Sequence, residues 1–344
     1  MSQDTLSDVL RSVRLRSAVF YYVSCDGAWV AEAPASRDIA AAVMPEAEHV
    51  IEYHVLTAGE CWAAIVGEPA IKMRRGDVVL LTHGDAHVLS SSPGLRADPD
   101  VGGYFALGRV QRPFRVHHDG EGPPQVDLKR TLPAPGAQAC AASFVCGFIG
   151  CDVRPFNPLL ATLPDLLHLP AEGGGAWAEQ FARFAAAESA AKRPGSEALL
   201  ERLSEMMFVD AIRRHVERMP EESTGWLAGL SDRFVGRALA LLHEQPAAEW
   251  TIDDLSRQVG LSRSALHERF VALIGLAPMQ YLTQWRMQLA SRLLLEGRAS
   301  VASVALDVGY DSEAAFARAF KRLVGLPPAT WRRSRETAPA AVAS

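Results

Sequence analysis

The last third of the chain contains one helix–glycine–helix pattern twice, about fifty residues apart. In the first copy, Thr251 can cap a helix that ends at Gly260, and Ser262 can cap the helix that follows. Glycine fits the tight turn between the two helices because it tolerates a positive φ. Leu266 and Phe270 recur on one face of the second helix, as a buried face requires. Helix, glycine turn and capped second helix make up a helix-turn-helix.

The second copy repeats this register from Ser300 to Phe320, with Gly309 at the turn. Both copies end on the same short closing segment, which is Ile274–Pro278 in the first and Val324–Pro328 in the second. A single match to such a pattern has many false positives, whereas two in register with one closing motif are specific. The repeat therefore predicts an all-α unit with two helix-turn-helix motifs.

A helix rich in leucine, tryptophan and arginine is expected between the two motifs, over Met279–Leu295. At about 1.5 Å per residue it would span roughly 25 Å. A spacer of that length could hold two recognition helices about one DNA turn, roughly 34 Å, apart on one face of the duplex. The alternative is an ordinary all-α bundle, which the repeated register disfavours.

The first half of the chain has the pattern of β-structure, because short apolar runs alternate with glycine, proline and aspartate turns. The expected strands are Ala18–Val23, Val50–Leu56, Cys61–Val66, Asp77–Leu81, His87–Ser90, Gly103–Leu107 and Ala142–Ile149. Many short strands at this spacing favour a sandwich or a small barrel. The period then becomes helical, and long helices are expected over Ala176–Ala191 and Ser196–Arg218.

The composition is that of an ordinary globular protein, with 49% hydrophobic and 22% charged residues. The sequence lacks an apolar run long enough for a transmembrane helix and has no secretory signal at its start, so a cytoplasmic location is expected. The net charge of −5 is unevenly distributed. Residues 231–344 carry about 14 Lys and Arg against about 11 Asp and Glu, a weak bias of the sign that nucleic-acid binding needs.

Residues 226–335 resemble the DNA-binding region of the AraC/XylS family of transcription regulators. The resemblance is carried by Gly309–Lys321 and by Gly325–Arg333. It implies a regulator that binds double-stranded promoter DNA, acts on RNA polymerase and places the second helix of each motif in the major groove.

Carried over by position, the base-facing candidates are Ser264, His267, Glu268, Glu313, Ala314 and Arg318. The candidates for phosphate contacts are Arg263, Arg269, Lys321 and Arg322. Arg318 is the strongest single candidate, since arginine can bind both acceptors of a guanine edge. Glu268 could accept from cytosine or form a surface ion pair, and both alternatives stay open at this point.

The first half is similar to the cupin-type sensor domain found in a subgroup of AraC-like regulators. The similarity rests on Tyr53–Trp62, Gly76–His87 and Cys146–Pro158, and spans about residues 8–220. It implies an α+β multidomain fold, with an N-terminal β jelly-roll and trailing helices before the all-α double helix-turn-helix domain. The expected divisions are a sensor and dimerisation domain over 1–220 (barrel about 8–156, helices about 157–218), a linker over 219–230, a DNA-binding domain over 231–335 and a disordered tail over 336–344.

The chain departs from the cupin metal motif, because around Glu52 it has only His49 and His54, without a paired His-x-His. Only His87 falls on a metal-binding position of the second cupin motif, so an oxygenase-type iron centre is not expected. A different constellation could bind zinc, because two imidazoles and two thiolates complete a tetrahedral set. Its members are His83, His87, Cys146 and Cys151, which flank glycine-containing turns.

Two other interpretations of these residues remain open. The histidines could stabilise turns while the cysteines pack as small hydrophobic groups. Some relatives sense oxidants through N-terminal cysteines, which makes Cys61, Cys140 and Cys146 redox candidates.

The function expected from all this is sequence-specific regulation of transcription in response to a small effector, a metal or a redox signal. A homodimer through Ser196–Arg218, which carries an apolar stripe with Met206-Met207, is a further expectation, and the alternative is that this stripe covers the barrel. One alternative is a DNA-binding adaptor without an effector. The other is a cupin-type metalloenzyme, which is disfavoured because the cupin ligands are incomplete and no nucleophile elbow, P-loop or dinucleotide fingerprint occurs. The effector, the promoter and the direction of regulation are left open.

Overall fold

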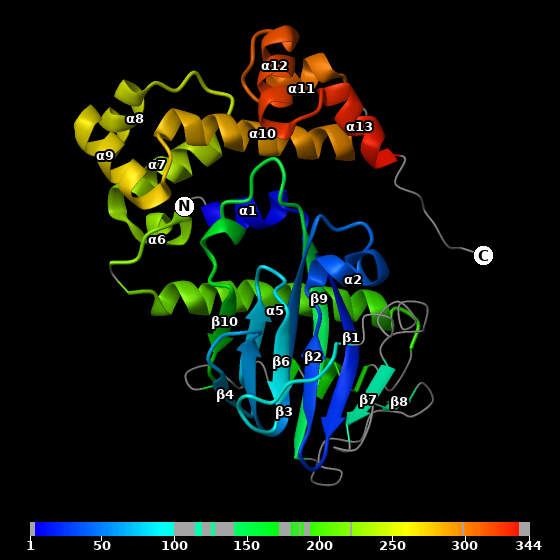
Figure 1. Cartoon of the computed structure of the whole chain (residues 1–344). Helices are drawn as coiled ribbons and strands as arrows, with labels where there is room; N and C mark the ends of the chain where they lie inside the picture. Colours follow the sequence, from blue (N-terminus) through cyan, green and yellow to red (C-terminus); the bar gives the residue numbers. More distant parts are fainter. Residues whose placement is uncertain are drawn as a thin grey trace. The chain divides into compact units, whose positions relative to one another are not determined.

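The computed structural model describes most of the chain and divides it into two compact units (Figure 1). The described residues are 4–99, 114–118, 125–127, 141–171, 180–181, 183–185, 187–188, 193–220, 222–297 and 299–336. One unit, here called the sheet unit, comprises residues 15–151 and 163–218. The other, called the helical unit, comprises residues 1–14, 152–162 and 219–344. The architecture confirms the predicted class, a curled N-terminal sheet followed by a helical helix-turn-helix region.

The sheet unit is built on a curled, mostly antiparallel sheet. Its described strands are β1 (Arg16–Cys25), β2 (Val30–Ala33), β3 (His49–Ile65), β4 (Ile71–Arg74), β5 (Val78–Leu81), β6 (His87–Ser90), β7 (Phe114–His118), β8 (Gln125–Asp127), β9 (Ala142–Cys151) and β10 (Leu166–Leu169). Hydrogen-bonded neighbours run in the order β10-β5-β3-β9-β1-β7-β8. The strands β4 and β6 pair with the second half of β3, and β2 pairs with β6. The expected strand Gly103–Leu107 lies outside the described residues.

Two of the expected strands are one continuous strand, β3, which belongs to both halves of the sheet. Its first half pairs with β5 and β9, and its second half with β4 and β6. The pairing register with β9 shifts between Leu56 and Ala58, next to Gly59 at φ +75°. A Cβ at Gly59 would lie 1.9 Å from the carbonyl oxygen of Ala141, so only glycine fits where the strand changes partners.

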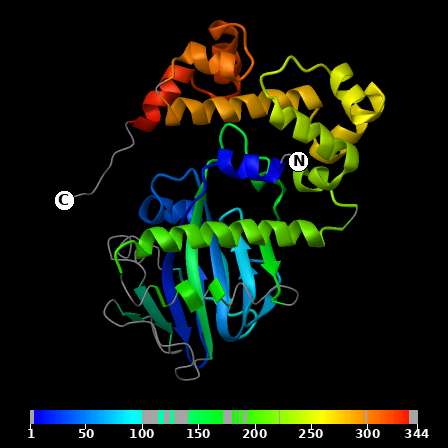
Figure 2. The same ribbon diagram turned by 180° about the vertical axis from the view of Figure 1, so that it is seen from behind.

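The concave side of the sheet holds an apolar core, and helices cover its outer face. The core includes Val23, Cys25, Leu56, Cys61, Val79, Leu89, Phe144 and Cys146. Figure 2 shows α5 (Ser196–Arg218), with the predicted bounds, lying across the outer face of the sheet. There the Tyr53 hydroxyl lies 2.9 Å from Ser204 Oγ. The short α2 (Ser36–Val43) packs against β3. The expected helix Ala176–Ala191 falls partly outside the described residues.

The helical unit contains both predicted motifs. Its helices are α1 (Thr5–Ser12), η1 (Leu160–Thr162), α6 (Trp226–Ser231), α7 (Arg233–Glu244), α8 (Ile252–Val259), α9 (Arg263–Ile274), α10 (Pro278–Glu296), α11 (Val301–Asp307), α12 (Glu313–Val324) and α13 (Pro328–Glu336). The caps follow the sequence prediction, since Thr251, Ser262 and Ser300 each accept a hydrogen bond from the first turn of their helix. Gly260 and Gly309 adopt the positive φ that the turns require.

The helical unit also includes two segments that the sequence places with the sensor, residues 1–14 and 152–162. Gln288 of α10 holds both: its Nε2 donates to the carbonyl of Ser12, and its Oε1 accepts from the backbone N–H of Phe156. Arg14 and Asp152 join the two segments through a bidentate ion pair, at 2.5 and 2.9 Å. The expected linker contains α6, and the expected tail beyond Glu336 lies outside the described residues.

Candidate functional site

The predicted DNA-facing residues all lie on α9 and α12, the second helix of each motif. Each helix buries one apolar face, with Leu266 and Phe270 on α9 and Phe316 and Phe320 on α12. The exposed positions include all of the candidates, namely Arg263, Ser264, His267, Glu268, Arg269, Glu313, Ala314, Arg318, Lys321 and Arg322. Figure 1 shows α10 running between the two motifs. DNA contact by these residues stays a prediction.

Two of the candidate arginines on α9 form ion pairs with other residues of the protein. On α9, Arg269 forms a bidentate ion pair with Asp232, in which Nε donates to Oδ1 at 3.1 Å and Nη2 donates to Oδ2 at 2.5 Å. Its guanidinium also lies 5.6 Å from the Phe234 ring centroid. Arg263 pairs with Asp253 at 3.2 Å. Arg269 is therefore held against the start of α7, and binding a phosphate would require it to leave Asp232.

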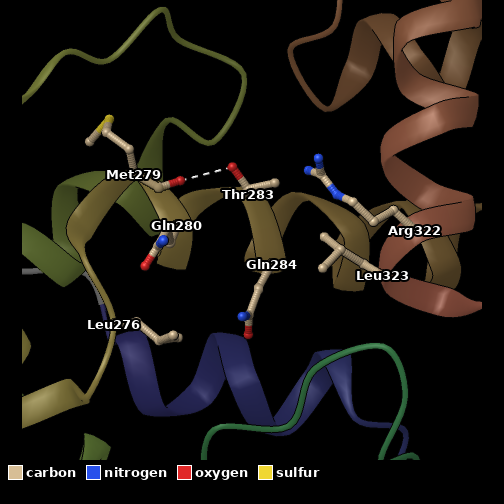
Figure 3. Close-up of a pocket in the computed structure, with 7 residues that line it drawn as sticks. All are labelled: Leu276, Met279, Gln280, Thr283, Gln284, Arg322 and Leu323. Atoms are coloured by element: carbon tan, nitrogen blue, oxygen red, sulfur yellow. Dashed lines mark hydrogen bonds between the residues drawn. The ribbon is translucent and has the colours of Figure 1, made fainter.

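A cavity of about 480 Å³ lies beside α10, between the two motifs (Figure 3). The first half of α10 supplies most of its wall, Leu276 adds the end of the first motif, and the last turn of α12 adds the rest. Its lining residues are Leu276, Met279, Gln280, Thr283, Gln284, Arg322 and Leu323. At this level of α10 the side chains of the two motifs leave open space between them.

In the sheet unit, a buried group of three ionisable side chains meets the requirements of a metal site. Glu52 and His54 are two residues apart on β3, so they share its inward face. His87 comes from β6. The two Nε2 atoms of His54 and His87 lie 2.8 Å apart, and the Glu52 carboxylate oxygens lie 3.8 and 4.0 Å from them. One potential ligand atom from each residue falls within 4.8 Å of the other two.

Neighbouring residues form hydrogen bonds that hold the three side chains of this cluster in place. Tyr21 donates its hydroxyl to Glu52 Oε1 at 2.8 Å, and His87 Nδ1 lies 3.1 Å from the carbonyl oxygen of Asp85. His54 Nδ1 lies 2.9 Å from the sulfur of Cys146, its cross-strand neighbour on β9. Glu52 Oε2 is buried and has no hydrogen-bond partner. That oxygen lies 4.0 Å from His87 Nε2 and lacks the hydrogen-bond partner that buried polar atoms normally have.

Burial controls the charge of these groups. It lowers the pKa of His87 to about 4 and that of His54 well below its ordinary value, so both imidazoles are neutral and can offer a lone pair. Burial also raises the pKa of Glu52 to about 8, against the opposing hydrogen bond from Tyr21. The Glu52 carboxyl therefore tends to keep its proton at neutral pH, and a metal cation bound to the carboxyl would displace that proton.

The four-residue zinc set predicted from the sequence is not brought together. His87 and Cys146 both contact His54, but His83 is about one-third exposed and lies 3.1 Å from the carbonyl oxygen of Leu163. Cys151 opposes His49, and it lies five residues from Cys146 on a regularly paired strand. Because side chains alternate along a strand, Cys146 and Cys151 point to opposite faces.

The redox candidates have different positions. Cys61 and Cys146 are buried in the apolar core, together with Cys25. Burial raises the pKa of Cys61 to about 12 and that of Cys146 well above its ordinary value, so both remain thiols at neutral pH. Cys140 lies outside the described residues.

Sequence reasoning missed Glu52 and His54 as ligands because it looked for the paired histidines of a cupin motif. The usable signal was the spacing Glu52-x-His54 within an expected strand, which places a carboxylate and an imidazole on one face. His87 could be expected beside them only if β6 pairs with β3, and that pairing is a tertiary feature.

Comparison with known proteins gives a consistent result for both units. Residues 4–217 match the family model described as Cupin, and residues 255–334 match the one described as Helix-turn-helix domain. A putative AraC-like transcription regulator of Streptomyces lividans is 35% identical over 332 residues, which cover 96% of this chain and 98% of the relative. The chain belongs to the AraC-like transcription regulators.

A second relative of this AraC-like regulator is the HTH-type transcriptional regulator AlkR of Acinetobacter baylyi. It is 26% identical over 96% of this chain and 99% of its own length. Among solved structures, the DNA-binding domain of AdpA, crystallised with a target DNA, is 29% identical. It covers 32% of this chain and 99% of that chain, with a TM-score of 0.31. Among the described helices of the AraC-like regulator, none combines the length and apolar character needed to cross a membrane.

Proposed function

We propose that this DNA-binding regulator responds to a divalent transition metal held by Glu52, His54 and His87 in its N-terminal domain. The observation that carries the proposal is the orphaned Glu52 Oε2, which is buried and lies 4.0 Å from His87 Nε2 without a hydrogen-bond partner. An unpaired buried carboxyl oxygen costs free energy, and a cation bound there would give that oxygen a partner and favour the ionised carboxylate.

The donor set fits zinc or iron(II) by its chemistry. Two neutral imidazoles and one carboxylate are a common three-ligand set for zinc, and the same set binds non-haem iron(II). Histidine ligands usually donate their second ring N–H to a carbonyl or carboxylate, and His87 has such a partner in the Asp85 carbonyl. Three protein ligands leave a coordination position open, so the bound metal would supply a Lewis-acidic site for a small anionic effector.

A change at this cluster has a short route along the chain to the helical unit. Cys146, beside His54, lies on β9, and β9 ends at Cys151. The next residues, 152–162, belong to the helical unit and include Phe156, which Gln288 of α10 binds. Metal binding would therefore act on the strand that continues into the segment 152–162, and this segment contacts α10 through Phe156.

We also propose that the exposed faces of α9 and α12 read promoter DNA. The partner of the DNA-bound regulator would be RNA polymerase. Arg318 is exposed on α12 and suits a guanine edge, and the adjacent Lys321 and Arg322 suit phosphates. The family resemblance and the exposure of these residues support this part of the proposal.

A homodimer through α5 is also proposed. The helix buries one apolar stripe under the sheet, including Leu200 and Met207, but Leu199 and Met206 are 44% and 58% exposed on another side. Their spacing of seven residues places them on one stripe, as helix pairing requires. Sedimentation of the full chain should show a dimer that Leu199→Gln with Met206→Gln converts to a monomer. A wild-type monomer at tens of micromolar would contradict this part.

The metal proposal is tested by DNA binding with and without metal. A binding site is first selected from random duplexes with the full chain, and its affinity is then measured for metal-free and zinc- or iron(II)-loaded protein. The expected result is a change of at least about fivefold, within the usual range of coupling between two sites. Equal affinities for protein shown to carry the metal would instead support an adaptor without an effector.

A further inference from the structure

We propose that Arg286 is a positioning residue that fixes the two helix-turn-helix motifs relative to each other and thereby sets the spacing of the DNA half-sites. The inference rests on the proposed reading of DNA by α9 and α12. Arg286 lies half-buried in the middle of α10, and it is absent from the residues expected to touch DNA.

On one side, Arg286 holds the loop that connects α7 to α8 in the first motif. Its Nε donates to the carbonyl oxygen of Pro246 at 2.7 Å, and its Nη2 donates to that of Ala248 at 2.8 Å. The planar guanidinium reaches both carbonyls at once because its N–H donors form a rigid fork. The loop of the first motif is thus tied to the connecting helix by two charge-assisted hydrogen bonds.

On the other side, the same guanidinium lies 5.8 Å from the centroid of the Tyr310 ring in the second motif. Tyr310 directly follows the turn glycine and packs edge-on against Phe316 of α12, with ring centroids 5.7 Å apart. A guanidinium at this distance from an aromatic ring is attracted by the ring's π-electrons. One side chain therefore connects the first motif to the recognition helix of the second.

The backbones of the two motifs meet at the same place. Gly309, at φ +82°, lies against the loop residue Ala247, between the two carbonyls that Arg286 holds. A Cβ at Gly309 would come within 2.6 Å of the Ala247 carbonyl oxygen and 2.8 Å of its Cα. Because even a Cβ has no room there, the two backbones lie against each other, and this packing limits how far one motif can shift while the arginine holds the loop in place.

Nearer the start of α10, the motifs are separated by space. Thr283, one turn before Arg286, lines the cavity between the motifs together with Arg322 and Leu323 of α12 (Figure 3). The second half of α10 packs into the core of the second motif through Met287, Ala290 and Leu294. Where the cavity keeps the motifs apart, Arg286, Tyr310 and the loop around Ala247 supply a direct contact between them.

The consequence is a preference for one half-site spacing. Two recognition helices held rigidly can enter the major groove together only when their half-sites have the matching separation and rotation. Loss of the arginine would leave each motif packed on α10 through its own core, but would release the loop of the first motif from Tyr310 and let the two motifs shift against each other. Binding to the native spacing should weaken, and binding to altered spacings should be penalised less.

The test uses the full chain and a duplex selected by the wild type, together with versions that carry one base pair more or less between the half-sites. For the wild type we expect each change to weaken binding at least about tenfold, comparable to one or more mismatched base pairs. For Arg286→Met the penalty should fall to about twofold, a level at which the motifs act almost independently. Arg286→Lys should also relax the preference, because a point charge cannot hold both carbonyls.

The matched control is Arg292→Met, which removes the same charge from the same helix. Arg292 pairs within α10, with Glu296 at 3.7 Å, so this variant should keep the wild-type penalty. A folded Arg286→Met protein with an undiminished spacing penalty would overturn the inference. Should that variant unfold, Arg286→Lys and Tyr310→Leu, measured in the same way, decide the question. If the wild type selects no sequence at all, the proposed function itself fails, which is a different result.

Discussion

The Nε2 atoms of His54 and His87 lie 2.8 Å apart in the interior of the sheet unit, although the two residues are 33 positions apart in the chain. Both imidazoles are neutral there because burial lowers their pKa values. The two nitrogens share one hydrogen bond, and Glu52 Oε2, which has none, completes a group of three potential metal ligands. A metal cation bound by these three side chains would give the unpaired oxygen of Glu52 a partner.

Elemental analysis should find about one equivalent of transition metal per wild-type chain, bound by three protein ligands. His87→Ala and Glu52→Gln should each remove most of it, because losing one of three ligands breaks the site. His83→Ala is the matched control, since His83 contacts the Leu163 carbonyl and lies outside the cluster. Equal metal content in the wild type and in Glu52→Gln would contradict the assignment.

The same experiment distinguishes between two possible metal sites. One is the cluster of Glu52, His54 and His87, and the other is the set expected from the sequence, which comprises His83, His87, Cys146 and Cys151. The earlier set requires that His83→Ala and Cys151→Ser lose the metal, whereas the observed geometry requires that both keep it. Loss of metal in these two variants, with retention in Glu52→Gln, would reverse the conclusion.

His243 should make the helical unit less stable in acid. It is buried, stacks on Trp285 with ring centroids 4.0 Å apart, and its Nε2 lies 2.8 Å from the Tyr281 hydroxyl. Burial lowers its pKa to about 3, from an ordinary value of 6.5. The unfolded chain therefore binds more protons between these values, and the stability of the fold falls as the pH drops from about 6.5 towards 3.

The pH effect is measured by urea unfolding of the full chain, followed by tryptophan fluorescence. Between pH 6 and 4, the free energy of unfolding of the wild type should decrease by about 1.4 kcal/mol per pH unit more than that of His243→Gln. Every other titrating group is common to the two proteins, so the difference isolates His243. Identical slopes would show that this imidazole is accessible to protons in the folded state.

Arg269 and Lys321 should respond differently to substitution, although both were expected to contact phosphates. Lys321→Ala should reduce the salt dependence of DNA binding by about one counterion, because Lys321 is exposed near the end of α12 and can contact a phosphate of the DNA backbone. Arg269→Ala should leave the salt dependence nearly unchanged and cost roughly 1 kcal/mol of stability, since its fork is engaged with Asp232. A larger salt effect for Arg269 than for Lys321 would show that Arg269 leaves Asp232 to bind DNA.

The helical unit could be predicted from local rules almost residue by residue. Helix caps, turn glycines and apolar periodicity depend only on neighbours along the chain, and these signals located α8, α9, α11 and α12. The ion pair of Arg269 with Asp232 escaped prediction because it joins residues 37 positions apart. The same is true of the contact between Gly309 and Ala247.

The sequence predicted a β-sheet in the first half of the chain, but it did not predict which strands pair or in which register. Alternating apolar runs located most of the strands, yet the break expected after Leu56 is a change of partner within one strand, β3. Which metal candidates lie together could not be predicted, because glycine turns alone do not determine how strands pair. Strand alternation separates Cys146 from Cys151, and strand pairing sets His87 beside His54 instead.

Base reading by α12 depends on Arg318, and it can be tested by comparing specific with random DNA binding. Affinities of the wild type and of Arg318→Ala are compared on the selected duplex, on its single-base variants and on random duplex at one salt concentration. We predict that Arg318→Ala loses about 1–3 kcal/mol of discrimination at one base pair and keeps its affinity for random duplex. An unchanged ratio of specific to random binding in Arg318→Ala would contradict the account, because it would place α12 outside the groove.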